Sequence, residues 1–461
     1  MIFLRITHIL SLFILSALSV TLMAESAESV YADSCSTDSL NVTCYMLHQP
    51  KHIYSIGGSG GIDHLLNVKV RGEKLVKRGW GSSYNVFMHS QANPLDREIS
   101  VYDRVFGFPT LEAGIQLQDL SHTRLHTGDT PYMSVVGMIW SGYIGFRRDI
   151  YRNRRWAYGY GLYNGISLSS RTYEGEDNVD DDLVGQHLSV YFGLDLFASY
   201  RITPRDELSL QFGYKHVSNG ATDRPNKGAN TYGLAVRARH DLNRPDADKG
   251  MTFDERQARL QAFKREAFVP YAYLDINGLV GFRTMYEEFI LRRSYLAPDE
   301  PGYLDGKLAL HTVWGTNVVQ MFRYNQVHAS GLGLEYMFAG YAGRSGLIEH
   351  ECAIRAPESD FADGYKHSKH VLAIAGYHEV YYKQLSLQMS FGTYLFRRLG
   401  WVSKHYEAPV YETVGIRYYP KFFKPFYIGY NVKANLGKAY DMEIKVGLHA
   451  GRWNLKKTKK E

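Results

Sequence analysis

The sequence predicts an all-β fold, an antiparallel transmembrane β-barrel of about 12 to 16 strands. Three observations lead to this prediction. Apolar and polar residues alternate through many segments after residue 50. These segments run for about 10 to 16 residues, which is longer than the usual strand of a soluble domain. Finally, the 36 Tyr, 22 Phe and 6 Trp concentrate near the segment ends, as aromatic girdles at membrane interfaces do.

The alternation is clearest between residues 187 and 215. In the first segment the even positions carry the apolar residues from Leu188 to Tyr200, and most odd positions are polar or small. A second segment repeats the pattern from Leu208 to Tyr214. Further segments of this kind surround residues 385–391 and 442–450. A soluble sandwich could also alternate, but the many Asp, Glu, Lys and Arg on the polar face suit a wet lumen better than a dry core.

Composition excludes several other classes of protein. With 45% hydrophobic residues among 461, the chain has enough apolar surface to bury and is not intrinsically disordered. No stretch after residue 24 is apolar enough for a membrane helix. The 53 basic and 47 acidic residues are too balanced to indicate a nucleic-acid-binding protein.

The first 24 residues are predicted to be a secretory signal peptide. Arg5 precedes an apolar run from Ile9 to Leu22, and Ala24 is a suitable residue at the cut. Cleavage after Ala32 is the second choice, and a retained anchor is the alternative. The segment 25–50 follows, in which Cys35 and Cys44 are close enough to form a disulfide in an oxidising compartment; a third cysteine, Cys352, is left over.

The rest of the chain divides at a polar connecting segment, residues 242–266, whose end is compatible with a helix. Alternating segments occupy residues 51–241 before it and 267–461 after it, the latter ending in a charged tail. The number of segments does not decide between one barrel and two. One barrel is the simpler interpretation, because each closure needs its own edge pairing. Short turns such as 203–206 face the periplasm and long connections such as 174–182 face outward. We expect the acidic connection 174–182 to be a solvated loop, with divalent-ion binding as an alternative.

One polar cluster stands on the apolar side of the barrel wall. His216 and Ser218 continue the apolar row that begins at Leu208, so they share its outward face. Across the hairpin, Asn230 continues the apolar row that includes Tyr232. We expect Ser218 to pair with Asn230. Polar groups against hydrocarbon are costly, so this cluster indicates a hydrolase whose substrate is the lipid itself. An interfacial polar pair is the alternative interpretation.

The same stretch resembles the signature of the outer-membrane lipid A 3-O-deacylase (PagL-type) family. The matching positions are His216, Ser218, Asn219, Pro225, Asn226 and Gly228. Residues 51–241 resemble the compact barrel of that family, and the remainder is similar to long, acyloxyacyl-hydrolase-like members from Bacteroidetes-like bacteria. The resemblance implies an exported outer-membrane serine esterase that removes an ester-linked acyl chain from lipid A of lipopolysaccharide and needs no metal or cofactor.

The resemblance also assigns roles to single residues. Ser218 would attack the ester with His216 as its base, and Asn219, Gly220 and Ala221 would form the oxyanion hole. Pro225, Asn226 and Gly228 would shape the loop. The third catalytic position holds Asn230 where the resemblance implies an acid. An amide can orient the imidazole but cannot stabilise its charge. Either Asn230 serves in a slower enzyme, or an acid from another strand takes this place, or the site is idle. The alternative function is a non-catalytic barrel, a channel or structural protein with a degenerate site.

Two further motifs are set aside. The run Gly57 to Gly61 fits G-x-S-x-G, but the nucleophile elbow needs a strand–turn–helix unit, and a glycine-rich turn is the better interpretation. His367 and His370 flank Lys369 and follow Lys366. Without a third ligand, an exposed basic stretch is favoured over a metal site.

Overall fold

The computed structural model describes residues 50–70, 72–94, 99–127, 133–244 and 268–454. The predicted signal peptide, the candidate pair Cys35 and Cys44, and most of the connecting segment 242–266 therefore lie outside the described residues. Cys352 is a free, buried thiol.

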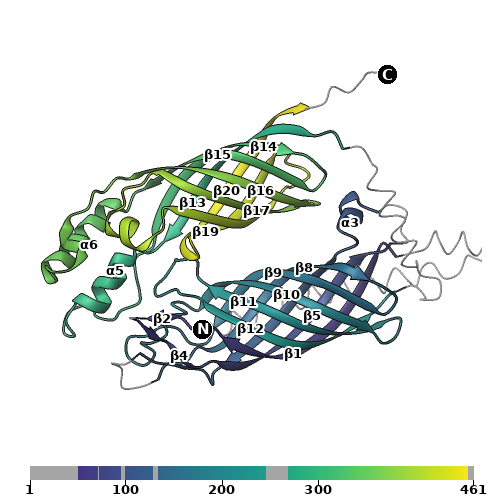
Figure 1. Cartoon of the computed structure of the whole chain (residues 1–461), viewed down its shortest axis with the longest axis horizontal. Helices are drawn as coiled ribbons and strands as arrows, with labels where there is room; N and C mark the ends of the chain where they lie inside the picture. Colours follow the sequence, from purple (N-terminus) through teal and green to yellow (C-terminus); the bar gives the residue numbers. More distant parts are fainter. Residues whose placement is uncertain (1–49, 71, 95–98, 128–132, 245–267, 455–461) are drawn as a thin grey trace, which may run out of the picture. The chain divides into compact units, whose positions relative to one another are not determined.

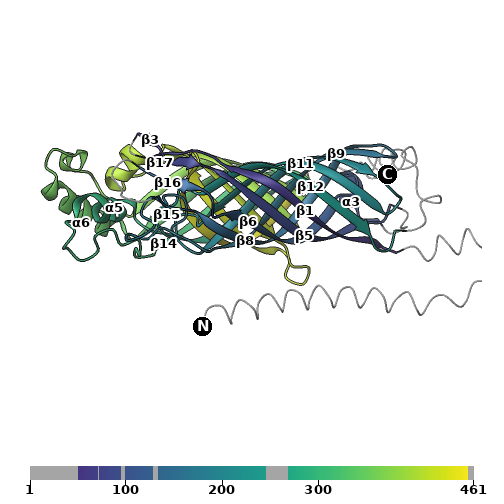
Figure 2. The ribbon, with the colours of Figure 1, turned by 90° about the horizontal axis from the view of Figure 1, so that it is seen from below.

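The fold is all-β, as predicted, but the strands close two barrels rather than one (Figures 1 and 2). Each barrel has eight antiparallel strands. The simpler interpretation, a single barrel, was wrong. When only the barrel strands are counted along the chain, the eighth pairs with the first and closes one barrel, and the sixteenth pairs with the ninth and closes the other. Among the described residues, no helix combines the length and apolarity needed to cross a bilayer.

The first barrel uses strands that span the chain from residue 52 to residue 241. They are β1 (His52–Leu65), β5 (Trp80–Ala92), β6 (Thr110–Leu120), β8 (Gly137–Arg152), β9 (Trp156–Ser169), β10 (Leu188–Arg201), β11 (Asp206–Ser218) and β12 (Ala229–Asp241). Two short ribbons lie in its long connections: β2 (Lys69–Val70) with β3 (Glu73–Lys74), and β4 (Val76–Arg78) with β7 (Arg124–Leu125). A short helix, α3 (Val101–Val105), lies between β5 and β6.

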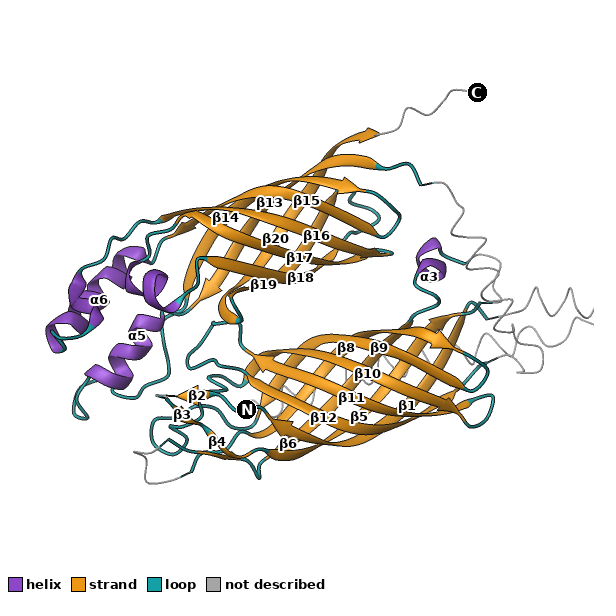
Figure 3. Ribbon diagram, in the orientation of Figure 1, coloured by secondary structure: helices purple, strands orange, loops and turns teal. Residues whose placement is uncertain are grey.

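The second barrel spans residues 271 to 454. Its strands are β13 (Tyr271–Arg283), β14 (His311–Arg323), β15 (His328–Ala339), β16 (His370–Tyr382), β17 (Leu385–Phe396), β18 (Val410–Tyr418), β19 (Phe426–Asn435) and β20 (Lys438–Asn454). Helices gather at one end of it (Figure 3): α5 (Tyr286–Ile290), α6 (Ala342–Arg355), a 3₁₀ turn (Asp360–Asp363) and π-helical turns (Leu291–Tyr295 and Val402–Tyr406).

Alternation along the strands sorts the residues as the sequence predicts. On β11, Leu208, Leu210 and Phe212 are 42%, 55% and 51% exposed, whereas the intervening Ser209 and Gln211 are buried in the lumen. The same holds on β12, where Leu234 and Val236 face outward. The polar row therefore lines the interior of the barrel and the apolar row meets the membrane.

Packed side chains, rather than a wide water-filled channel, occupy the interiors. In the first barrel the buried carboxylate of Glu112 accepts hydrogen bonds from Arg237 at 2.6 Å and Tyr143 at 2.7 Å. In the second, buried Arg417 donates to Asp275 at 2.7 Å, and Lys445 pairs with Glu443 at 2.8 Å. Eight strands leave a lumen just wide enough for side chains to fill, which counts against the alternative function of a channel.

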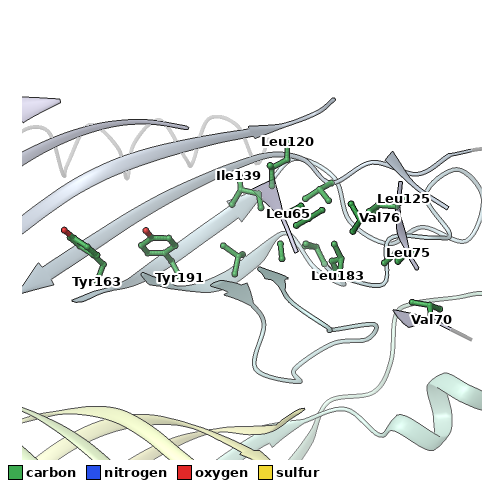
Figure 4. Packing of buried hydrophobic residues seen from close by; sticks show 14 of the residues in the cluster. Leu65, Val70, Leu75, Val76, Leu120, Leu125, Ile139, Tyr163, Leu183 and Tyr191 are labelled. Carbon is green, nitrogen blue, oxygen red and sulfur yellow. The ribbon is translucent and has the colours of Figure 1, made fainter. Parts of the chain in front are cut away.

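An apolar cluster closes the first barrel at the end with the long connections (Figure 4). Leu65, Leu120 and Ile139 come from strand ends, and Leu183 and Val184 come from the connection between β9 and β10. The cluster also includes Val217 and Ala229, which are the lumen-side neighbours of the predicted site residues. It thus supports the β11–β12 hairpin from inside.

Candidate functional site

The predicted catalytic residues lie at one end of the β11–β12 hairpin, on its outward face. His216 stands directly opposite Asn230, and Tyr214 stands opposite Tyr232. The expected pairing of Ser218 with Asn230 was wrong by two residues: Ser218 lies beyond the last β12 pair and is opposite Val190 of β10. A slip of two residues preserves the face, so the predicted outward orientation of His216, Ser218 and Asn230 is found.

The imidazole of His216 is held by the amide of Asn230. Nδ1 of His216 lies 2.7 Å from Oδ1 of Asn230, and the hydroxyl of Tyr214 donates to the same oxygen at 2.5 Å. Directly opposed residues have their Cβ atoms about 5 Å apart, so this contact follows from the strand register. Three side chains on two strands thus form one hydrogen-bonded unit.

The orientation of the Asn230 amide determines which histidine tautomer is present. Nδ2 of Asn230 donates to the carbonyl oxygen of Gly228 at 3.2 Å, and a carbonyl accepts only from the NH₂ side of an amide. Oδ1 must therefore face His216, so Nδ1 carries the hydrogen. In the neutral ring Nε2 is then unprotonated and free to act as a base. This is the arrangement that an Asn needs in order to replace an acid in orienting a histidine.

Ser218 is the last residue of β11 and is buried. Its hydroxyl oxygen accepts a hydrogen bond from the backbone N–H of Gly220 at 3.2 Å. Within the described residues, no hydrogen bond joins this hydroxyl to His216. Residues two apart on one strand face have Cα atoms about 7 Å apart, and apo geometry at such sites is often loose.

The three residues expected to form the oxyanion hole are adjacent but not equally available. The N–H of Ala221 donates to Oδ1 of Asn219 at 3.0 Å, and Nδ2 of Asn219 donates to the carbonyl of Asp223 at 3.2 Å. Both of these donors are engaged in holding the loop. Only the N–H of Gly220 is directed at the Ser218 hydroxyl. Gly220 and Ala221 have φ of 62° and 69°, and this left-handed turn brings that N–H back toward Ser218.

The loop residues Asn226 and Gly228 contact the site directly. Oδ1 of Asn226 accepts from the N–H of Asn219 at 3.2 Å. Gly228 has φ +75°, and a Cβ at this position would come 2.7 Å from Cε1 of His216. Pro225, which follows a cis peptide bond, is buried. The Pro-Asn-x-Gly motif therefore both fixes the loop and lets the backbone approach the imidazole.

The acidic connection 174–182 is only in part the solvated loop that we expected: Glu174, Glu176 and Asp177 are exposed, whereas the residues after them are buried. Asn178, Asp180, Asp181 and Asp182 are buried. Two of the buried carboxylates accept short hydrogen bonds: Thr127 donates to Asp180 at 2.6 Å, and the backbone N–H groups of Leu183 and Val184 donate to Asp181 at 3.2 Å. Burial raises the pKa of the Asp181 carboxyl to about 8, although the hydrogen bonds from the backbone N–H groups act to lower it.

This connection also supports the loop 219–228 through the backbone. The N–H of Lys227 donates to the carbonyl of Asp182, and the N–H of Gly228 donates to the carbonyl of Leu183, both at 3.0 Å. Sequence reasoning missed this support, and it also missed Tyr214. Tyr214 could have been found from its place in the outward row, two residues before His216.

The other motifs carry no catalytic site. Gly57 to Gly61 lies within β1 and is not a turn. Added Cβ atoms at Gly57 and Gly61 would meet the backbone of β12 at 2.3 and 2.4 Å. Glycine is therefore needed at these positions because the two strands approach each other closely. Within the described residues there is no group of three His, Cys, Asp or Glu that could hold a metal ion.

Comparison with known proteins links both barrels to one family. The family model described as "Lipid A 3-O-deacylase (PagL)" matches residues 141–239, which contain the hairpin. The model described as "Acyloxyacyl hydrolase, C-terminal domain" matches residues 273–453, the second barrel. The resemblance to the lipid A 3-O-deacylase family is confirmed. The predicted location, the bacterial outer membrane, is confirmed with it.

Solved structures show a weaker likeness to this chain. The outer-membrane enzyme PagL is 14% identical, with 40% of this chain and 97% of that chain covered and a TM-score of 0.25. Neisserial surface protein A is 12% identical, with 41% and 97% covered and a TM-score of 0.24. No curated protein matches the chain.

Proposed function

We propose that this PagL-type protein is an outer-membrane serine esterase that removes an ester-linked acyl chain from lipid A. Ser218 is the nucleophile, His216 the base, and Asn230 the residue that orients the imidazole. The observation that carries the proposal is the 2.7 Å contact between His216 Nδ1 and Asn230 Oδ1 on the lipid-facing side of the wall. Hydrocarbon offers these polar side chains no water as a hydrogen-bond partner, but an acyl ester in the membrane is within their reach.

The reaction would proceed in two steps. The Ser218 oxygen attacks the acyl carbonyl carbon while Nε2 of His216 takes the hydroxyl proton. The N–H of Gly220 stabilises the negative charge on the carbonyl oxygen. The ester bond to the sugar then breaks, and the His216 imidazolium returns the proton to the leaving sugar oxygen. Water next attacks the acyl-serine with His216 again as base, which releases the fatty acid and restores Ser218.

The acyl content of lipid A tests the proposal. Lipid A is incubated with the purified full chain and examined by mass spectrometry. Loss of one acyl chain is expected with the native chain and not with Ser218→Ala or His216→Ala. Intact lipid A after incubation with the folded native chain would contradict the proposal and favour a non-catalytic barrel.

The second barrel offers a matched control. Ser330 also lies on the outward face, and its hydroxyl is 2.9 Å from Nδ1 of His378. It has no loop like residues 219–228 beside it, because β15 continues past it to Ala339. Ser330→Ala is expected to leave deacylation unchanged. Loss of activity in Ser330→Ala alone would place the nucleophile in the second barrel.

A further inference from the structure

Four basic residues gather at one end of the second barrel. Lys366 and Lys369 precede β16, whereas Arg398 and Lys404 follow β17. The two segments are joined by the backbone, because the N–H of Ser368 donates to the carbonyl of Arg398 at 2.6 Å and the N–H of Gly400 donates to the carbonyl of Lys366 at 3.3 Å. We call these four residues the basic rim. All four are exposed.

The charges of the basic rim are not neutralised within the described part of the chain. No Asp or Glu oxygen there lies within 4.0 Å of any of the four cationic groups. The neighbouring Arg397 behaves differently: it turns inward, pairs with Glu407 at 3.3 Å and donates to the carbonyl of Ala408 at 2.9 Å. Asp363, which precedes Lys366 in the chain, accepts instead from the hydroxyl of Tyr365 at 3.3 Å.

An apolar and aromatic surface adjoins the rim on the outside of the barrel wall. Tyr336, Leu372 and Leu395 are 39%, 38% and 56% exposed. Two residues connect this surface to the rim. The guanidinium of Arg398 lies 5.1 Å from the centre of the Phe396 ring, and Nδ1 of His370 is 2.8 Å from the hydroxyl of Tyr336. Cationic groups above an apolar wall match a lipid with an anionic headgroup.

The connections of the second barrel place the rim in the outer leaflet. The end where β13 begins and β20 ends has the short connections 324–327, 383–384 and 419–425. The opposite end has the long connections 284–310, 340–369 and 397–409, and the last two contain the rim. Long connections of outer-membrane barrels face outward and short turns face the periplasm.

We propose that the basic rim binds the phosphate groups of a phosphorylated glycolipid, lipid A, whose acyl chains lie along Tyr336, Leu372 and Leu395. This is a binding site on the second barrel, separate from the β11–β12 hairpin. Charge complementarity favours this occupant, because uncompensated Lys and Arg meet anionic groups next to a surface that meets hydrocarbon. The binding does not depend on hydrolysis at Ser218.

Native mass spectrometry of the detergent-solubilised full chain tests this site. All measurements use the Ser218→Ala background, so that hydrolysis cannot consume the lipid. The probes are bis-phosphorylated lipid A and the same lipid after enzymatic dephosphorylation. We expect the variant Lys366→Gln/Lys369→Gln/Arg398→Gln/Lys404→Gln to bind bis-phosphorylated lipid A at least about tenfold more weakly than the chain with an intact rim. The dephosphorylated lipid is expected to bind weakly to the chain with an intact rim and to the rim variant alike.

The control removes four exposed charges from the short turns: Arg154→Gln/Arg205→Gln/Lys421→Gln/Lys424→Gln. It is expected to retain lipid A normally. Equal retention by the rim variant and the control, or equal retention of dephosphorylated lipid A, would overturn the proposal. Heat-modifiable migration in gels verifies that each barrel is folded. If the fourfold variant does not fold, Lys366→Gln/Lys369→Gln must show the same direction of change, and unchanged retention by that pair would also overturn it.

These outcomes are separable from those of the proposed esterase. A native chain that leaves lipid A intact would refute hydrolysis without altering retention by Ser218→Ala. Conversely, a rim variant that retains lipid A normally would refute this site while deacylation by the native chain remained.

Discussion

Gly228 lies against the imidazole of His216. A Cβ at Gly228 would stand 2.7 Å from Cε1 and 3.2 Å from Nδ1 of the ring, and the backbone there has φ +75°. The carbonyl of the same residue fixes the Asn230 amide. One glycine thus sets both the position of the histidine and the orientation of its partner.

We expect Gly228→Ala to lower the rate of acyl release from lipid A by about tenfold or more, since a displacement near 1 Å at a catalytic group can cost up to 100-fold. Gly72→Ala is the matched control. Gly72 also has a positive φ, +86°, but an added Cβ there meets nothing within 4 Å. Both variants carry backbone strain, so an equal loss of activity in the two would show that contact with His216 is not the cause.

Asn230→Leu should reduce the turnover number by about 100-fold or more, because nothing then fixes the tautomer of His216. The Michaelis constant should change little, since Asn230 has no contact with substrate in this account. Steady-state kinetics on lipid A in detergent measures both. An unchanged turnover number would show that His216 is oriented by another group, or is not the base.

Tyr214→Phe should lower activity by only about fivefold, since a neutral hydrogen bond contributes about 1 kcal/mol. The hydroxyl of Tyr214 supports Oδ1 of Asn230 and does not contact His216 directly. Tyr232→Phe, directly across the hairpin, is the control with no expected effect. A loss as large as that of Asn230→Leu would mean that Tyr214 takes part in the chemistry itself.

The stability of the loop 178–184 is expected to depend on pH, because this loop buries Asp181. Its pKa is raised to about 8 from a usual value near 4, so the folded loop holds a proton that the unfolded loop releases. The stability of the loop should therefore be greatest below about pH 4 and fall as the pH rises toward 8. Hydrogen exchange of residues 178–184, corrected for intrinsic rates, measures it. Asp181→Asn should remove the dependence, and a native loop whose protection does not fall between pH 6 and 8 would contradict the assignment.

The sequence allowed the face of each strand to be predicted, but not the partners of the strands. Alternation is local, so it placed His216, Ser218 and Asn230 outward correctly. The pairing of Ser218 with Asn230 was wrong because a slip of two residues leaves every face unchanged. Closure into two barrels depends on contacts such as Ser55 with Asp241, which no local pattern encodes.

Burial in the connections was also beyond sequence reasoning. An acidic run is usually solvated, but Asp181 buries its carboxylate against N–H donors from its own loop. Likewise, the glycines of β1 suggested a turn, although their role is close approach to β12. In each case the deciding partner is a backbone group that only the folded chain brings near.

The central claim, that Ser218 forms an acyl intermediate with His216 as its base, is tested most directly by partitioning with hydroxylamine. An acyl-serine transfers its acyl group to hydroxylamine as well as to water. We predict that the native chain, acting on lipid A, yields acyl hydroxamate at the expense of free fatty acid, and that Ser218→Ala yields neither. Release of free fatty acid alone at every hydroxylamine concentration, or acyl release by Ser218→Ala at the native rate, would contradict the account.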